Sequence, residues 1–330
     1  IILIGLVILT LSVIYDIVSV TARIPYLPLT LSGMTFLILS FAWLLGNRYT
    51  ELYNRLDEET NLLEVKVRER TEELRDAIFK LQERNKQHEK DLRLARVIQM
   101  NLLPDQPENL EGLRFVAHYL PMDDLGGDFY DIFPFSQTKT GFLLTDVAGH
   151  GVAAALVSMM LKLAFTSEAK NDKLPAEVLT QVNDSMMSHL TTGEFFTCVY
   201  GVLDRAKQSF IYASGGHLPV LHYKKRDHQI YELENTGPIM GFRRGVEFEN
   251  KEIKVQEGDR LIFYTDGVIE ARNAREDEFG LDRLKETLLK YSESPLDRSV
   301  QALMRELYSY SGDWTVQDDF TLFIVEIVQL

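Results

Sequence analysis

Two long uncharged runs at the start of the chain constrain its fold most strongly. Residues 1–20 are almost all apolar, and residues 26–45 carry no charge and place Tyr26 and Trp43 near their two ends. About 20 apolar residues are enough to span a bilayer, and aromatic side chains favour its interfaces. We therefore expect residues 1–46 to form two transmembrane helices in a hairpin. Two buried helices of a soluble domain are the alternative.

The charges around these runs indicate how the hairpin is oriented. Asp16 lies inside the first run, and because a carboxylate facing lipid is costly, we expect it to face a partner helix or the interface. Arg48 and Arg55 follow the second run, whereas the loop holds only Arg23. Basic residues favour the inner side of a membrane, so the rest of the chain is expected in the cytoplasm. The chain begins at Ile1 without a basic leader, which indicates the C-terminal piece of a longer protein.

The next segment, residues 47–103, contains no Gly and no Pro and carries a near-heptad apolar seam. Across residues 49–102 the seam advances by four and three residues in turn, with one stutter. Glu, Lys and Arg surround it. The pattern predicts a coiled-coil signalling helix that forms a parallel homodimer through residues 49–102. A single helix docked on its own domain is the alternative, since the seam includes polar Asn85, His88 and Gln99.

Pro104 ends this helix, because Pro cannot continue it. Residues 104–330 mix short apolar strands, tight turns and pairs of helices, which predicts an α+β domain built as an antiparallel β-sandwich flanked by helices. The strands are expected near residues 114–120, 128–134, 141–146, 196–204, 209–214, 219–223, 247–255, 260–265 and 320–328. The helices are expected near residues 151–168, 175–190, 279–290 and 295–310.

Composition excludes several classes of function. The net charge is −14 and no basic stripe is present, so the chain is not expected to bind nucleic acid. The single cysteine, Cys198, excludes an intrachain disulfide and a cysteine zinc site. It lies in an apolar run, residues 195–203, and is expected in the core rather than as a nucleophile. The sequence contains neither a Gly-rich loop with Lys nor a G-x-S-x-G turn.

Four aspartates stand at the ends of predicted strands. Asp128 and Asp318 come just before a strand, and Asp146 and Asp266 come just after one. The start of one strand and the end of its antiparallel neighbour share an edge of the sheet, so all four carboxylates can converge on one rim. Asp in such places often only caps a turn, so each residue alone is a weak signal.

A carboxylate cluster of this kind favours divalent cations. Gathered carboxylates repel one another and raise one another's pKa values, and bound cations remove that penalty. All-oxygen ligation favours Mg²⁺ or Mn²⁺ over Zn²⁺. Two such ions can hold a phosphoryl group and activate a water between them. Glycines beside the aspartates let the backbone approach a ligand closely; they are Gly126, Gly127, Gly149, Gly151 and Gly267.

The ordered motifs of residues 92–330 resemble the SpoIIE/RsbU-type branch of the metal-dependent Ser/Thr protein phosphatases. The motifs are ARVIQMNLLPDQP, LGGDFYD, LLTDVAGHGVAAAL, FFTCVYGVLD, IYASGGHLPVL, TGPIMGF, GDRLIFYTDGVIEARN, EFGLDRL and QDDFTLFIV. The resemblance implies a phosphatase domain over residues 104–330. The segment before it is similar to the last two helices of bacterial seven-transmembrane signalling receptors, joined to a coiled coil that precedes many output domains.

The resemblance also implies roles for individual residues. Asp128 is expected to bridge two metal ions, Mn²⁺ or Mg²⁺. Asp146 is expected to bind one of them, with the backbone carbonyl of Val147 on the other, and Asp266 and Asp318 complete the set. The nucleophile is expected to be water bound between the metals. Residues expected to support these ligands from outside are Asp131, Asp319, Gly127 and Gly267.

Two histidines near these motifs have open roles. His150 is a candidate proton donor, although it can equally be a residue of the turn that leads into the helix at 151–168. His217 closes the family's glycine-histidine stretch, which Ser214 precedes where the family more often has Ala, and it is expected to be structural.

The implied substrates are phosphoserine or phosphothreonine on STAS-domain proteins that antagonise anti-sigma factors in bacteria. The sequence thus predicts a signalling phosphatase in the bacterial inner membrane, with its catalytic domain in the cytoplasm. A catalytically silent module that binds a STAS partner is the alternative, although such a module has no need of four aspartate ligands. GGDFYD also resembles a diguanylate cyclase signature, but the residues that follow do not fit it.

Overall fold

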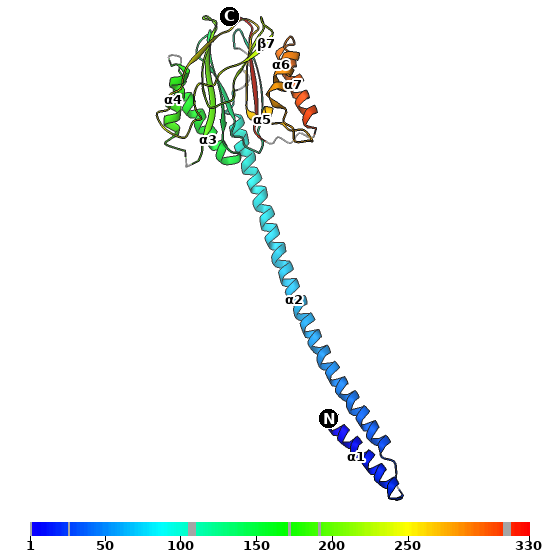
Figure 1. Cartoon of the computed structure of the whole chain (residues 1–330). Coiled ribbons are helices and arrows are strands. Elements are labelled where there is room, and N and C mark those ends of the chain that lie inside the picture. The colour runs from blue at the N-terminus through cyan, green and yellow to red at the C-terminus, as the bar shows by residue number, and fades with distance from the viewer. Residues whose placement is uncertain (1, 26, 105–109, 171–172, 191–192, 313–317) are drawn as a thin grey trace. The chain divides into compact units, whose positions relative to one another are not determined.

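The computed structural model describes residues 2–25, 27–104, 110–170, 173–190, 193–312 and 318–330 (Figure 1). The chain divides into two compact units, Ile1–Gln87 and His88–Leu330. The first unit is helical, and the second contains all the described strands.

The first unit begins with a helical hairpin, in which α1 (Ile2–Thr21) lies against the start of α2 (Thr30–Met100). Small residues allow this approach, since a Cβ on Gly33 would stand 3.1 Å from the Cα of Leu9. Asp16 accepts hydrogen bonds from the backbone N–H groups of Leu29 at 2.8 Å and Thr30 at 2.9 Å. The carboxylate therefore caps the free N–H groups at the start of α2, which confirms that it faces a partner helix.

Among the described helices, three are long and apolar enough to cross a membrane. Two of them are α1 and the first part of α2, as the uncharged runs predict. The third, α3 (Gly151–Glu168), packs on the strands of the second unit, where its Leu161 and Phe165 are fully buried.

Helix α2 is continuous over 71 residues, because no Gly or Pro interrupts residues 47–103. It ends at Met100, just before the turn that reaches Pro104. The apolar seam residues of its middle part are exposed, with Leu63 61% and Leu74 62% accessible. The helix therefore presents an uncovered apolar face within a single chain.

The second unit contains two antiparallel five-stranded sheets. Sheet A runs, in spatial order, through β1 (Leu113–Leu120), β10 (Phe320–Ile327), β9 (Arg260–Tyr264), β6 (Leu221–Lys224) and β7 (Gln229–Glu232). Sheet B runs through β2 (Phe129–Pro134), β3 (Lys139–Val147), β4 (Phe196–Asp204), β5 (Ser209–Gly215) and β8 (Lys251–Lys254).

The helices cover the outer faces of the two sheets (Figure 1). Helices α3 and α4 (Pro175–Met186) pack on sheet B, and α6 (Gly280–Lys290) and α7 (Leu296–Ser311) pack on sheet A. The core lies between the sheets, where the stacked rings of Phe263 and Phe323 have centroids 4.3 Å apart. Cys198 is fully buried there, which confirms its place in the core. The predicted α+β sandwich flanked by helices is thus confirmed.

The structure contains two short elements that the sequence did not predict. Two other elements are shorter than their predicted ranges. Strand β7 has four residues, of which only Ile230 is partly buried, so it is too short to show the alternation that marks a half-buried strand. Helix α5 (Asp266–Ile269) is a single turn, too short to show a helical period. Strand β8 covers four residues of the predicted 247–255, and α4 ends at Met186 rather than near residue 190.

Candidate metal centre

Asp128 joins the two sheets at one end of the sandwich. It lies directly before β2 of sheet B and is only 2% exposed. Its Oδ2 accepts hydrogen bonds from the hydroxyls of Thr265 at 2.8 Å and Thr321 at 2.6 Å. Thr265 follows β9 and Thr321 lies in β10, so both donors belong to sheet A. The position of this carboxylate is therefore fixed by both halves of the domain.

Asp319 holds the loop that leads to Asp128. Its carboxylate accepts hydrogen bonds from the backbone N–H groups of Met122 at 2.7 Å, Gly127 at 2.5 Å and Asp128 at 3.4 Å. These bonds orient the loop from β10, the strand that also supplies Thr321. Asp319 thus holds the backbone on which Asp128 lies.

The other aspartates lie at the same end of the sheets. Asp146 is the penultimate residue of β3, and the pairing of Phe129 with Thr145 puts it beside Asp128. Asp266 opens α5 directly after β9, and Asp318 precedes β10. Since β9 and β10 are antiparallel neighbours, the end of one and the start of the other share an edge.

The carboxylates are close enough to shift one another's pKa values upward. Burial, with added repulsion from Asp266 and Asp318, raises the pKa of Asp146 to about 7. Burial, with Asp318 and Glu270, raises the pKa of Asp266 to about 6. Burial and then Asp146 raise the pKa of Asp128, against the opposing hydrogen bonds from the threonine hydroxyls. The structure therefore brings the four predicted aspartates into one electrostatic cluster.

No basic side chain offsets this cluster. In the described ranges, none of the ion pairs involves Asp128, Asp146, Asp266 or Asp318. Buried carboxylates without a cationic partner are costly, and a divalent cation is the usual remedy. The donor chemistry thus fits a hard cation.

The spacing of the donors limits how such a cation is held. Across the described residues, no three His, Cys, Asp or Glu side chains stand close enough together to ligate one ion. Mg²⁺-like ions usually take only one or two carboxylates and keep several waters, so this spacing fits them. The carbonyl of Val147 lies at the same rim, 2.8 Å from where a Cβ on Gly127 would stand.

Glycine is required at two positions of the rim for reasons of space. A side chain on Gly127 would meet the Val147 carbonyl, and one on Gly267 would collide with the carbonyl of Asp319. At both positions the backbone of one segment touches the backbone of another. Gly127 and Gly267 therefore allow two backbone segments to approach each other closely at the rim.

Two predicted site residues are held elsewhere. Asp131 is buried, and its carboxylate is 2.5 Å from Nζ of Lys162 on α3, so it faces the helix layer. His150 is exposed at the residue before α3, and its Nδ1 lies 2.9 Å from Oδ2 of Asp123. The structure does not bring either side chain into the carboxylate cluster.

His217 is buried beside the rim. Its Nδ1 lies 2.7 Å from the hydroxyl of Thr197, which pairs with Asp146 across β3 and β4. Burial lowers the pKa of His217 to about 4, against a weaker opposing effect of the Tyr264 carbonyl, so the ring is neutral. This neutral, buried state fits the structural role expected for it.

The sequence analysis missed three residues that position the site. Thr265 and Thr321 hold Asp128. The only sequence signal for them is that they lie in the same motifs as Asp266 and Asp319. Gln99 is the third, and its assignment to the coiled-coil seam is corrected here. It is 5% exposed and bonds to Gly126 within the second unit, so it is not available to a coiled-coil partner.

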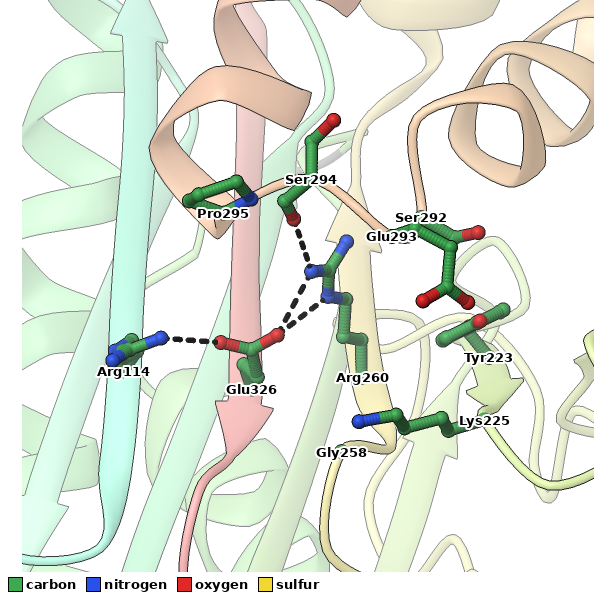
Figure 2. Close-up of a pocket in the computed structure, with 10 residues that line it drawn as sticks. All are labelled: Arg114, Tyr223, Lys225, Gly258, Arg260, Ser292, Glu293, Ser294, Pro295 and Glu326. Atoms are coloured by element: carbon green, nitrogen blue, oxygen red, sulfur yellow. Dashed lines mark hydrogen bonds and ion pairs between the residues drawn. The ribbon is translucent and has the colours of Figure 1, made fainter.

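A polar cavity of about 260 Å³ lies at the opposite end of sheet A (Figure 2). Arg260 opens β9 there, and its guanidinium donates to Glu326 at 2.8 Å and to the carbonyl of Ser294 at 2.8 Å. Arg114 lies 3.4 Å from the other oxygen of Glu326. Glu326 thus pairs with both guanidinium groups, and the described lining of the cavity holds ion pairs instead of a carboxylate cluster like that of the rim.

Comparisons with known proteins agree with this geometry. The family described as Stage II sporulation protein E (SpoIIE) matches residues 136–328, more than half of the chain. The phosphoserine phosphatase RsbU of Bacillus subtilis (strain 168) is 29% identical over 238 residues, which are 71% of this chain and 69% of RsbU. The phosphoserine phosphatase RsbP of the same organism is 26% identical over 242 residues, which are 72% of this chain and 58% of RsbP.

A solved structure shows the same fold. The SiaA-PP2C domain of Pseudomonas aeruginosa superimposes with a TM-score of 0.66 at 24% identity, covering 73% of this chain and 98% of that domain. The region that matches the SpoIIE family, residues 136–328, includes Asp146, Asp266 and Asp318. The chain belongs to the SpoIIE family, and it is a serine/threonine phosphatase of the SpoIIE/RsbU type.

Proposed function

We propose that this chain is a membrane-anchored signalling phosphatase that removes phosphate from phosphoserine or phosphothreonine on a protein. One observation carries the proposal. Asp128 is buried between two sheets and accepts hydrogen bonds from Thr265 and Thr321, in a carboxylate cluster that has no basic partner among the described residues. Such an arrangement is stable in its charged form only with cations bound, and it is open to solvent through the half-buried Asp146 and Asp266.

Two ions, Mn²⁺ or Mg²⁺, are proposed for this rim, held by Asp128, Asp146, Asp266, Asp318 and the carbonyl of Val147. When bound, such ions lower the pKa of a water ligand and offset the charge of a phosphoryl group. The threonine hydroxyls orient Asp128 and oppose the rise of its pKa, and Asp319 fixes the backbone that carries it.

His150 is proposed as the proton donor to the leaving oxygen. It is exposed at the start of α3, directly after the Val147–Gly149 turn. Its Nδ1 lies 2.9 Å from Oδ2 of Asp123, and this contact holds the ring.

The proposed substrate is a phosphorylated STAS-domain protein that antagonises an anti-sigma factor. The support is the similarity of the phosphatase region to RsbU and RsbP, both named phosphoserine phosphatases. A silent module that binds the same partner is the second candidate, but no observation favours it, since the carboxylate cluster is complete.

The domains proposed are a membrane hairpin at 1–46, a coiled-coil helix at 47–103 and the phosphatase at 104–330. The proposed location of the hairpin is the bacterial inner membrane, with the phosphatase in the cytoplasm. Two observations support this location: the apolar helices, and the basic residues that follow the apolar part of α2. The exposed apolar seam of α2 supports a parallel homodimer through most of residues 49–102. A change in packing near residues 92–104 is proposed to alter the assembly of the metal site.

The test is phosphate release by the full chain in detergent micelles. The substrates are a phosphorylated STAS-domain protein and an aryl phosphate, each with Mn²⁺, Mg²⁺ or chelator. We expect metal-dependent release that falls at least about 100-fold in Asp146→Ala and Asp266→Ala. Asp282→Ala, on the exposed face of α6, is the matched control and keeps full activity. Metal-independent release, or activity that survives in Asp146→Ala, contradicts the proposed site, and partner binding without release favours the silent module.

A further inference from the structure

An exposed aromatic surface stands beside the carboxylate rim and has no role in the proposed chemistry. Phe242 is 63% exposed, and its ring stacks on Phe195 with centroids 5.3 Å apart. Ile239 is 39% exposed next to them, and Pro238 and Arg243 are also exposed. We call these five residues the Phe242 surface. Four of them, all except Phe195, border a groove of about 600 Å³.

The Phe242 surface is directly connected to the segment that carries Asp146. The carbonyl of Phe195 accepts a hydrogen bond from Ala148 at 3.0 Å. Phe196 exchanges two backbone hydrogen bonds with Met240, at 3.1 and 3.0 Å, and pairs with Val147 across β3 and β4. A phosphorylated residue at the rim therefore has its neighbouring residues within reach of the Phe242 surface.

The loop that carries this surface is fixed in place. Asn183 is fully buried on α4, and its side-chain amide donates to the carbonyl of Arg243 at 2.7 Å and accepts from Gly241 N–H at 3.0 Å. Asp184 accepts from Gly245 N–H at 2.8 Å. A preorganised loop loses little entropy on binding, which is what a recognition surface needs.

The charge of this surface complements an acidic partner. The rim itself is negative, and the whole chain carries a net charge of −14. Among the described residues, the guanidinium of Arg243 has no hydrogen-bond or ion-pair partner, and Arg244 donates only to the hydroxyl of Ser188. An exposed unpaired cation beside an exposed aromatic ring favours a ligand with one carboxylate and one apolar side chain.

We infer that the Phe242 surface selects the substrate by binding the residues that flank its phosphorylated side chain. The preferred phosphoprotein segment carries an apolar residue, which packs on Phe242 and Ile239, and an acidic residue, which pairs with Arg243. This inference rests on the proposed function, since it assigns substrate preference to the same site.

Binding of fluorescent peptides to the full chain tests it, in detergent with Mn²⁺ and measured by anisotropy. One peptide carries Leu and Glu beside its phosphorylated position, and the other carries Ala and Lys. For binding, that position holds a non-hydrolysable phosphonate analogue of phosphoserine, and for hydrolysis it holds phosphoserine. We expect the wild type to bind the first peptide at least roughly tenfold more tightly. Phe242→Ala and Arg243→Glu abolish this preference, and Arg243→Glu binds the Lys peptide better than the wild type does. The matched control Tyr231→Ala, on exposed edge strand β7, retains the preference.

Hydrolysis of an aryl phosphate separates this inference from the proposed function. The small substrate does not reach the Phe242 surface, so its kcat/KM is expected to be unchanged in Phe242→Ala and Arg243→Glu. Equal binding of the two peptides by the wild type overturns the inference even if both are hydrolysed. A peptide preference that survives both substitutions also overturns the inference. So does a result in which the substitutions change the oligomeric state and leave the peptide preference as it was, because that result assigns the surface to a second copy of the chain. Absence of any hydrolysis overturns the proposed function, while the anisotropy result still decides this inference.

Discussion

Gln99, in the last turn of α2, forms a reciprocal pair of hydrogen bonds with the backbone of Gly126. Its Nε2 donates to the Gly126 carbonyl at 2.6 Å, and its Oε1 accepts from the Gly126 N–H at 3.2 Å. Gly126 is followed by Gly127 and Asp128, whose N–H groups are held by Asp319. One side chain of α2 thus bonds to a residue that lies two positions before Asp128, the carboxylate at the centre of the candidate site.

Replacement of Gln99 is expected to weaken the metal site. In Gln99→Ala the buried N–H and carbonyl of Gly126 lose their partners, which costs roughly 1–3 kcal/mol of stability. The freed loop then holds Asp128 less well, so we expect half-maximal activity to require at least about tenfold more Mn²⁺. A Mn²⁺ titration of phosphatase activity measures this. The control Gln82→Ala, on the exposed part of α2, is expected to match the wild type, and an unchanged titration for Gln99→Ala contradicts the coupling.

The stability of the metal-free protein is expected to fall as pH rises. Burial and neighbouring carboxylates raise the pKa of Asp146 to about 7 and that of Asp266 to about 6, above the value of 3.8 for a free carboxyl. The folded state therefore binds protons more tightly than the unfolded state. This stabilisation is complete below about pH 4 and is lost as pH rises through 6 and 7.

Thermal unfolding in chelator at pH 5 and pH 8 checks this sign. We expect the midpoint temperature of the phosphatase transition to be about 5 °C lower at pH 8 than at pH 5. Mn²⁺ is expected to restore the higher midpoint at pH 8, because the bound cation offsets the carboxylate charges that protons offset at pH 5. Asp146→Asn removes one repelling charge and is expected to reduce the difference. A metal-free protein that is more stable at pH 8 than at pH 5 contradicts the cluster.

Asp131 is expected to matter for folding and not for turnover. Its buried carboxylate is paired with Lys162 at 2.5 Å, away from the rim. In Lys162→Met that carboxylate loses its partner, which destabilises the domain by roughly 3 kcal/mol. The double variant Lys162→Met with Asp131→Leu removes both charges and is expected to recover most of the stability. Both are measured by denaturant unfolding, and a loss of kcat in the folded double variant would return Asp131 to the catalytic site.

Much of the fold is predictable from local pattern. Continuous apolar runs mark the strands around Phe142 and Leu322, and these side chains are fully buried. The aspartates at strand ends are found for the same reason, since antiparallel neighbours bring such ends together. Local pattern and sheet geometry therefore suffice to locate the rim.

The residues that orient the rim are not predictable in this way. Thr265 and Thr321 contact Asp128 across 137 and 193 residues of sequence, and a buried Thr in a strand carries no local sign of its partner. Gln99 occupies a position of the coiled-coil seam, but its side chain bonds to the backbone of Gly126. Periodicity alone therefore assigns it to a partner helix instead of to its own domain. Tertiary contacts decide both cases.

The dimer predicted from the seam of α2 can be tested with two adjacent leucines. Leu63 lies on the seam and is 61% exposed, whereas Leu62 lies off it and is 56% exposed. Because only the seam position is buried between two parallel helices, Leu63→Asp places a charge in a dry interface and is expected to shift the full chain toward monomer. Leu62→Asp carries the same charge on the solvated face and is expected to remain dimeric. Sedimentation in density-matched detergent distinguishes these states, and equal masses for the two variants contradict the parallel dimer.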